Sequence, residues 1–265
     1  MTFKDYILNP IADSGAVIGA TTREFMRTSY TKKFNDVLMR ENGKLDYTMY
    51  HHRKENAYII HLKIPSETVR KFYYDVVLRF TADASIKDAG RSLDMYNVQF
   101  FSNDPAFVYS YAHVFINRGL FVTDLSSKMS TKAKREAPKE KNPQNLVGYV
   151  KSFYFAYLFM QQRGLFKSYA WGKAESYSKN KLLQVVENAD EKIANRVDEG
   201  KKISRKKQRD AESSDAKKAS HTRLLSKDGL GRMVKTTGTV KSVRTTKSSG
   251  GLGNVRKTKT TRKLK

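Results

Sequence analysis

Cysteine is absent from the 265-residue chain, so the protein forms no disulfide bond, no thiolate metal site and no cysteine nucleophile. Long apolar runs are missing too. The longest uncharged stretches, residues 105–117 and 152–162, fall well short of the ~20 apolar residues that a membrane helix needs. The N-terminal MTFKDYILNPIAD carries Asp5 and Asp13 where a signal peptide would be apolar. We therefore expect a soluble protein, intracellular at synthesis and cytoplasmic unless it belongs to a particle, without a signal peptide, a transmembrane segment or a membrane partner.

Aromatic side chains stop at Tyr177, and none follows it. Charge is distributed the other way: residues 201–265 hold 21 Lys and Arg against 4 acidic residues, a net charge of +17. A segment so poor in large apolar side chains cannot offset the entropy of ordering itself. We expect a folded body over 1–173, an amphipathic helix or linker that turns basic over 174–210, and a cationic, low-complexity, intrinsically extended arm over 211–265.

Alternation with a period of two predicts three strands. In VRKFYYDVVLRF, large apolar residues alternate with charged ones, which places Asp75 and Arg79 on a solvated face of the strand. The stretch 57–63 is expected to pair with it through the link IPSET, and 95–101 is the third strand. Together they predict a small antiparallel sheet.

Helical spacing and capping residues predict the helices around this sheet. A capping box at Thr21 opens a helix over about 22–41. Asp104-Pro105 and Asn142-Pro143 are each expected to begin a further helix. Both helices are expected to end at an Arg-Gly-Leu-Phe sequence, because glycine readily adopts the left-handed backbone conformation that ends many helices. The stretch between these two helices, SSKMSTKAKREAPKEKNPQ, is expected to be a basic surface loop. The fold class that follows is α+β.

A narrow apolar stripe follows the last aromatic residue. It predicts one amphipathic helix that packs on its own body or on a second copy of the chain. The stripe consists of Leu182, Val186, Ala189, Ile193 and Val197.

Motifs that would carry enzyme chemistry are incomplete. The nearest approach to a phosphate-binding loop, GLGNVRKT, has Arg256 where glycine is required, and the five histidines lack metal-ligand spacing. A divalent-metal nuclease could use Glu55 with Glu67, or Asp75, but no acid–x–Lys pattern accompanies them on a strand. We expect no enzymatic activity, no catalytic residue, no metal and no cofactor, and keep the nuclease as an alternative.

The basic C-terminal segment predicts contact with nucleic acid. Each Lys or Arg that meets a phosphate releases a condensed counterion, so affinity follows from charge count without fixed geometry. No aromatic residue is present there to stack on bases, so binding without sequence specificity is expected. The composition leaves DNA and RNA both open, with DNA the more expected partner. The candidate nucleic-acid-binding residues are Lys201, Lys202, Arg205, Lys206, Lys207, Arg209, Lys235, Lys241, Arg244, Lys247, Arg256, Lys257, Lys259, Arg262 and Lys263.

Two runs resemble virion structural proteins of tailed bacteriophages: YNVQFFSNDPAFVYSYAHVFINRGLF (96–121) and NPQNLVGYVKSFYFAYLFMQQRGL (142–165). The resemblance lies in the order of strand, SND-P helix, basic loop and NP helix, and transfers no functional residue. It implies a non-enzymatic subunit of the capsid or neck of the virion, assembled with other structural proteins as a homo-oligomer, ring or shell. The basic arm would then reach packaged genome or a neighbouring subunit. A cellular RNA-binding or ribosome-associated factor is the other alternative.

Overall fold

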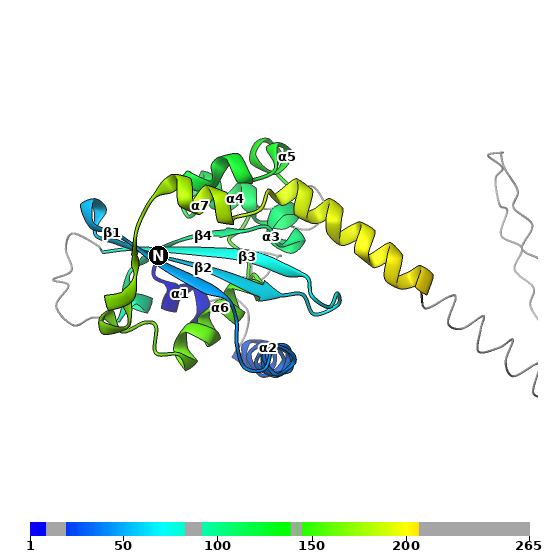
Figure 1. The fold of residues 1–265 in the computed structure, drawn as a ribbon, viewed down its shortest axis with the longest axis horizontal. Helices are drawn as coiled ribbons and strands as arrows, with labels where there is room; N and C mark the ends of the chain where they lie inside the picture. Colours follow the sequence, from blue (N-terminus) through cyan, green and yellow to red (C-terminus); the bar gives the residue numbers. More distant parts are fainter. Residues whose placement is uncertain (9–19, 83–91, 139–141, 143–144, 207–265) are drawn as a thin grey trace, which may run out of the picture. The chain divides into compact units, whose positions relative to one another are not determined.

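The structure is a computed structural model that describes residues 1–8, 20–82, 92–138, 142 and 145–206 (Figure 1). These residues belong to one compact unit. Its centre is a five-stranded sheet with helices around it, which confirms the α+β class. The segments 139–141 and 207–265 lie outside the described residues, so the expected extended arm does too.

The sheet has the strand order β4-β3-β2-β1-β5. Strands β1 to β4 form an antiparallel meander, and the short β5 pairs in parallel with β1. The strands are β1 (Tyr47–His52), β2 (Ala57–Pro65), β3 (Tyr73–Thr81), β4 (Asn97–Ser102) and β5 (Glu175–Ser176). The three strands expected from alternation are therefore present. β1 and β5 were missed, because YTMYHH is polar at its end and only Tyr50 in it is fully buried.

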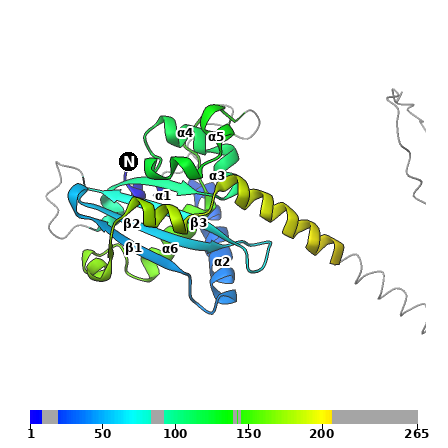
Figure 2. The same cartoon turned by 45° about the horizontal axis from the view of Figure 1, so that its top comes forward.

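Three helices lie on one side of the sheet in Figure 1: α1 (Phe3–Leu8), α2 (Ala20–Arg40) and α6 (Lys151–Gln162). Beyond the β4 edge, α3 (Pro105–Ser110), α4 (Ala112–Asn117) and α5 (Thr131–Arg135) group together, as Figure 2 also shows. The short helix α7 (Lys179–Val185) and a helix over 189–206 complete the unit. Four 3₁₀ helices connect these elements: η1 (Arg53–Glu55), η2 (Leu93–Met95), η3 (Thr123–Lys128) and η4 (Ser168–Lys173).

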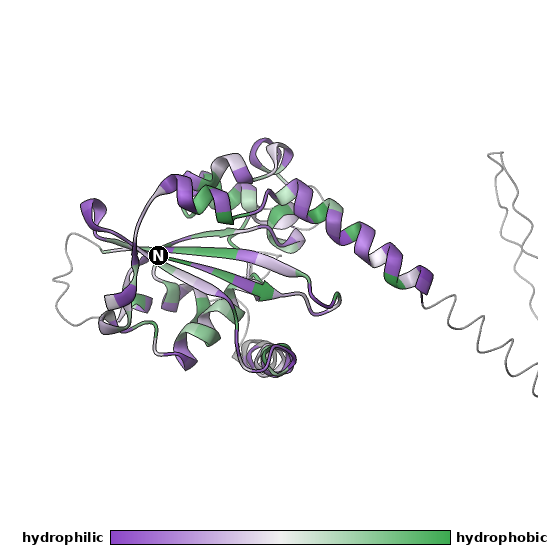
Figure 3. Cartoon of the chain, viewed as in Figure 1, coloured by the Kyte–Doolittle hydropathy of each residue, from purple (hydrophilic) through white to green (hydrophobic). Residues whose placement is uncertain are grey.

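Hydrophobic colouring shows the strands as the apolar centre of the body (Figure 3). Register aligns Ile60, Leu78 and Phe100 across three strands. The Phe100 ring lies 4.8 Å from that of Tyr6 and 4.8 Å from that of Phe153, so α1, α6 and the sheet share one aromatic core. Most aromatic residues of the two helical runs, such as Phe107 and Phe153, are buried there. Core packing explains their number.

The Tyr6 hydroxyl joins two buried backbone groups across this core. It donates to the carbonyl of Gly148 at 3.0 Å and accepts from the amide of Val150 at 2.9 Å. We expect Tyr6→Phe to lower the free energy of unfolding by about 1–3 kcal/mol, because both backbone groups lose their partner in a dry environment. Urea denaturation measures this change. The exposed Tyr169 provides the control, because Tyr169→Phe should leave stability unchanged, and an equal loss in both variants would contradict the assignment.

Helix boundaries differ from expectation, and the one helix expected from Asp104 to Gly119 is divided at Tyr111 into α3 and α4. Asp104 caps α3 as predicted, its carboxylate accepting from the amide of Ala106 at 3.0 Å. Asn142 opens no helix, since α6 begins at Lys151. The Asn142 side chain instead bonds Ser110 and Leu146 backbone groups and so fixes a loop. The expected basic surface loop is likewise partly ordered as η3 and α5.

The two glycine stops are as predicted. Gly119 follows α4 and Gly164 follows α6, and both have φ near +65°. That conformation suits glycine, which has no Cβ to clash with the preceding carbonyl.

The amphipathic stripe after Tyr177 is divided between two helices. Helix α7 ends at Val185, residues 186–188 leave helical geometry, and a second helix covers 189–206. Leu182, Val186, Ala189 and Ile193 are buried in the main core, so this part packs on its own body. Val197 is 49% exposed. The prediction of one continuous helix was therefore wrong, because the break at 186–188 turns the chain across the sheet.

Candidate nucleic-acid interface

Four of the fifteen candidate phosphate-binding residues lie within the described residues. Lys201, Lys202, Arg205 and Lys206 follow one another on the last turns of the helix over 189–206, and all four are exposed. The other candidates, from Lys207 to Lys263, lie outside the described residues. The structure thus describes the first residues of the basic segment, which lie on the last described turns of a helix (Figure 1).

Acidic residues on the preceding turn partly neutralise this helix end. Lys202 bonds Glu199 at 2.7 Å, and Lys201 lies 3.6 Å from Asp198. Such exposed pairs contribute little to stability and exchange readily for another anion. A phosphate that approaches Lys201 or Lys202 therefore displaces a weak carboxylate contact.

A buried polar cluster attaches the start of the helix to the sheet. The Asp75 carboxylate on β3 accepts from His61 Nε2 at 2.8 Å, from Asn103 Nδ2 at 2.8 Å and from the amide of Glu187 at 3.0 Å. Asp75 is 2% exposed and His61 4%. Asn103 also accepts from the amide of Asp75, so it is held at both ends of its side chain. This Asp75 cluster fixes residue 187, which lies just before the helix.

Burial by itself would raise the pKa of the Asp75 carboxyl. The hydrogen bond and charge of His61, the amide of Glu187 and the charge of Lys192 outweigh it and hold that pKa below its ordinary value of 3.8. Asp75 is therefore a carboxylate at neutral pH, and its negative charge is matched by surrounding donors.

Further contacts follow along the helix. Lys192 bonds Glu187 at 2.8 Å, and its ammonium lies 4.6 Å from the centre of the Phe72 ring, within cation–π range. Near the other end, Ile203 packs on Val69 and Phe72 of the β2–β3 connection and on Tyr74. The helix is thus attached at its first turn by polar groups and near its last described turn by apolar ones.

Arg196 lies between these two attachments. It lines a cavity of about 90 Å³ together with Glu67, Tyr74 and Lys151, and Glu67 is paired with Lys151 at 3.0 Å. Burial raises the pKa of Tyr74 to about 12, and the Arg196 charge opposes that rise. Tyr74 is therefore neutral at physiological pH and remains a hydrogen-bonding partner for the arginine.

The carboxylates weighed for a nuclease do not come together. Glu55 and Glu67 lie beyond opposite ends of β2, whose nine residues span about 30 Å, so they cannot share a metal ion. Asp75 and Arg79, expected on a solvated face, are both buried. That expectation was wrong because Asp124 of η3 and the chain at 187 contact these two side chains. Within the described residues, no group of three or more potential metal ligands occurs.

Arg79 belongs to a separate ion-pair network at the far end of β3. It pairs with Glu55 and, at 3.2 Å, with Asp124, which also accepts from the Tyr177 hydroxyl at 2.5 Å. Burial, together with the hydrogen bond to Asp124, raises the pKa of Tyr177. The network joins β3 to η3 and to the chain that leads into α7, which is a structural role.

Neither the Asp75 cluster nor this network was recognised from sequence. The available signal was the pair of acidic and basic residues on β3, but alternation alone cannot tell a solvated strand face from one covered by later chain.

The helices that the structure describes include no candidate for a membrane span, since none combines the necessary length with a sufficiently apolar sequence.

Comparison with known proteins returns no relative. The chain matches no protein-family profile, and neither a curated protein nor a solved structure is significantly similar to it.

Proposed function

We propose that this protein is a non-enzymatic structural protein whose basic C-terminal segment, residues 201–265, binds nucleic-acid phosphates without reading sequence. The observation that carries the proposal is the concentration of charge: this segment has a net charge of +17, against +8 for the 200 residues before it. The first of these cations, at 201–206, are exposed on the last described turns of the helix over 189–206, and the chain just before the first turn of that helix is attached to the sheet through the amide of Glu187. Counterion release by such a segment supplies affinity without a fixed binding geometry.

The same composition supports binding without base recognition. Residues 201–265 contain no Phe, Tyr or Trp that could stack on a base. Contacts to phosphate position a protein on nucleic acid but carry no sequence information directly. The expected partner is duplex DNA, and a marked preference for structured RNA would instead support a ribosome-associated or other RNA-binding role.

We also propose that the body is an assembly subunit of a phage particle, in the capsid or neck. The support is the resemblance in sequence of residues 96–121 and 142–165 to virion structural proteins, of whose expected elements the strand and the helix capped by Asp104 are present while the second helix begins at Lys151 and not at Asn142. The protein would then co-purify with intact particles at a fixed copy number. Recovery only in the particle-free fraction of an infected lysate would refute this location and leave the nucleic-acid proposal standing.

Two variants of equal net charge test the site of phosphate binding. One replaces Arg256, Lys257, Lys259, Arg262 and Lys263 by glutamine. The other replaces five exposed cations of the body, Lys32, Arg53, Lys54, Arg70 and Lys173. The C-terminal variant should reduce the slope of log K against log salt, by about 4–5 where all five residues contact phosphate, because each phosphate contact contributes ~0.9.

The body variant should leave that slope nearly unchanged. Anisotropy of labelled duplex DNA across a salt series measures both. Equal losses in the two variants would mean that net charge, and not the C-terminal segment, determines binding. Degradation of the duplex in Mg²⁺ would overturn the non-enzymatic assignment.

A further inference from the structure

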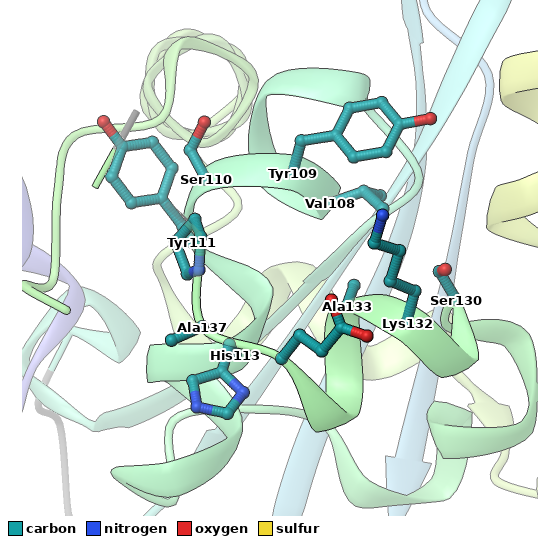
Figure 4. Close-up of a pocket in the computed structure, with 11 residues that line it drawn as sticks. Val108, Tyr109, Ser110, Tyr111, His113, Ser130, Lys132, Ala133 and Ala137 are labelled. Carbon is teal, nitrogen blue, oxygen red and sulfur yellow. The ribbon is translucent and has the colours of Figure 1, made fainter. Parts of the chain in front are cut away.

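A cleft of about 370 Å³ opens between the α3–α4 pair and α5 (Figure 4). Tyr109 and Tyr111 line it from α3 and the α3–α4 junction, and Ser130, Lys132 and Ala133 line it from α5 and its N-cap. Figure 4 shows Lys132 extending from α5 toward α3. The cleft is therefore bounded by an aromatic wall, Tyr109 and Tyr111, and by a second wall that carries one cation, Lys132, and one acid, Glu136.

Side-chain hydrogen bonds fix the width of this cleft. His113 on α4 contacts the carbonyl of Lys134 on α5 through Nδ1 at 3.2 Å and the amide nitrogen of Asn117 through Nε2 at 2.9 Å. Since the carbonyl can only accept and the Asn117 nitrogen only donates, His113 carries its proton on Nδ1. The Nδ1 contact joins α4 to α5, and the Nε2 contact with Asn117, which lies within α4, fixes the orientation of the ring.

Close packing on Gly148 fixes the position of Tyr111 in the aromatic wall. The Tyr111 ring packs so closely on Gly148 that any side chain at position 148 would overlap it. Tyr109 differs, because 54% of its surface is exposed although it belongs to a run whose other aromatic residues are mostly buried. An exposed tyrosine on a fixed helix presents a free π-face at the cleft.

The segment that contributes α5 to the cleft is rich in cations. Lys128, Lys132, Lys134 and Arg135 fall within eight consecutive residues; of these Lys132 lines the cleft, and so does the acid that follows them, Glu136. Lys134 is tied to the carbonyl of Ser126 at 2.9 Å, whereas Lys132 lines the cleft itself. An aromatic face, hydroxyl groups and an ammonium group in one cleft match the three parts of a nucleotide: base, sugar and phosphate.

We propose that the cleft between α3–α4 and α5 binds one unpaired nucleotide of a single strand, with the base packed on Tyr109 and its phosphate at Lys132. Its volume lies at the lower end of the ~300–1,000 Å³ range of small-molecule sites, which suits a single nucleotide. The inference rests on the proposed binding of nucleic acid and adds to it a site in the body. It supplies the aromatic contact that residues 201–265 lack.

Duplex and single-stranded probes separate the two sites, because the basic segment binds both whereas the cleft needs an unpaired base. We expect Tyr109→Ala in the full chain to weaken binding of oligo(dT) of about 12 nucleotides by about 5- to 150-fold, the range of a lost base–aromatic stack. Affinity for a duplex of equal length should be unchanged. Tyr109→Phe keeps the π-face and should retain single-strand affinity.

Tyr169→Ala provides the matched control, because Tyr169 is 76% exposed and lies outside the cleft. Lys132→Gln should weaken oligo(dT) more than the duplex, and oligo(U) in parallel tells whether the site accepts ribose. Equal losses for Tyr109→Ala and Tyr169→Ala, or an equal loss on duplex, would refute the cleft while leaving the phosphate-binding segment intact. Failure of the unmodified protein to bind duplex would refute the proposed function itself.

Discussion

Binding of the full chain to duplex DNA is expected to weaken ~10³–10⁵-fold between about 50 and 200 mM salt, the range for 6–10 phosphate contacts. The segment 201–265 offers 21 cations, so this number of contacts uses fewer than half of them. Lys201 and Lys202 should contribute less to the affinity than the other cations, because each must first break its ion pair, Lys201 with Asp198 and Lys202 with Glu199. Anisotropy titrations at five or more salt concentrations give the slope, and from it the number of contacts.

Duplexes of unrelated sequence should give the same slope and nearly the same affinity. A difference of tenfold or more among them at fixed salt would mean that base edges are read, which a segment of Lys, Arg, Ser and Thr contacting phosphate does not explain. Affinity that stays flat across the salt range would refute phosphate binding by this segment. The measurement thus tests mechanism and specificity together.

Asp75→Ala is expected to lower the free energy of unfolding by about 3–5 kcal/mol. The substitution leaves His61, Asn103 and the amide of Glu187 without the carboxylate that accepts from all three, in a site closed to water. Urea denaturation of the full chain measures the loss. The exposed Asp46 provides the control, because Asp46→Ala should change stability by less than about 0.5 kcal/mol.

The pH dependence identifies the carboxylate as the cause. The pKa of Asp75 is lowered in the folded protein, so its stabilising contribution is complete above the unfolded pKa, near 3.8, and is lost as pH falls toward the lower folded value. The stability difference between wild type and Asp75→Asn should therefore be constant from pH 7 to about 5 and shrink below about pH 4. A difference that grows on acidification would contradict the assignment. If Asp75→Ala does not fold, Asp75→Asn alone supplies this test.

Alternation and capping predicted the elements that are coded locally. Strand β3, the capped start of α3 at Asp104 and the glycine stops at 119 and 164 all follow from short-range backbone chemistry. The start of α6 could not be placed in this way, because Asn142 suits a helix cap equally well but bonds the backbone of Ser110, which is distant in sequence.

The Asp75 cluster shows the same limit at a larger scale. Asp75 and Arg79 look solvated when β3 is considered alone, but chain from more than forty residues later in sequence covers that face. Charge distribution, by contrast, needs no fold to be predicted, so the basic segment was apparent from composition. The cleft required the structure, since Tyr109 and Lys132 are separated by a helix, a turn and η3.

The placement of the attachments along the helix over 189–206 determines how it would respond to mechanical load. A pull on the end at residue 206 meets Ile203 first, then Arg196, then Lys192, and only last the amide of Glu187 on Asp75. The contacts would therefore break one after another, from the exposed end of the helix toward the sheet. The hydrogen bond to Asp75 would be the last to break, so the body would keep its fold while the helix detaches.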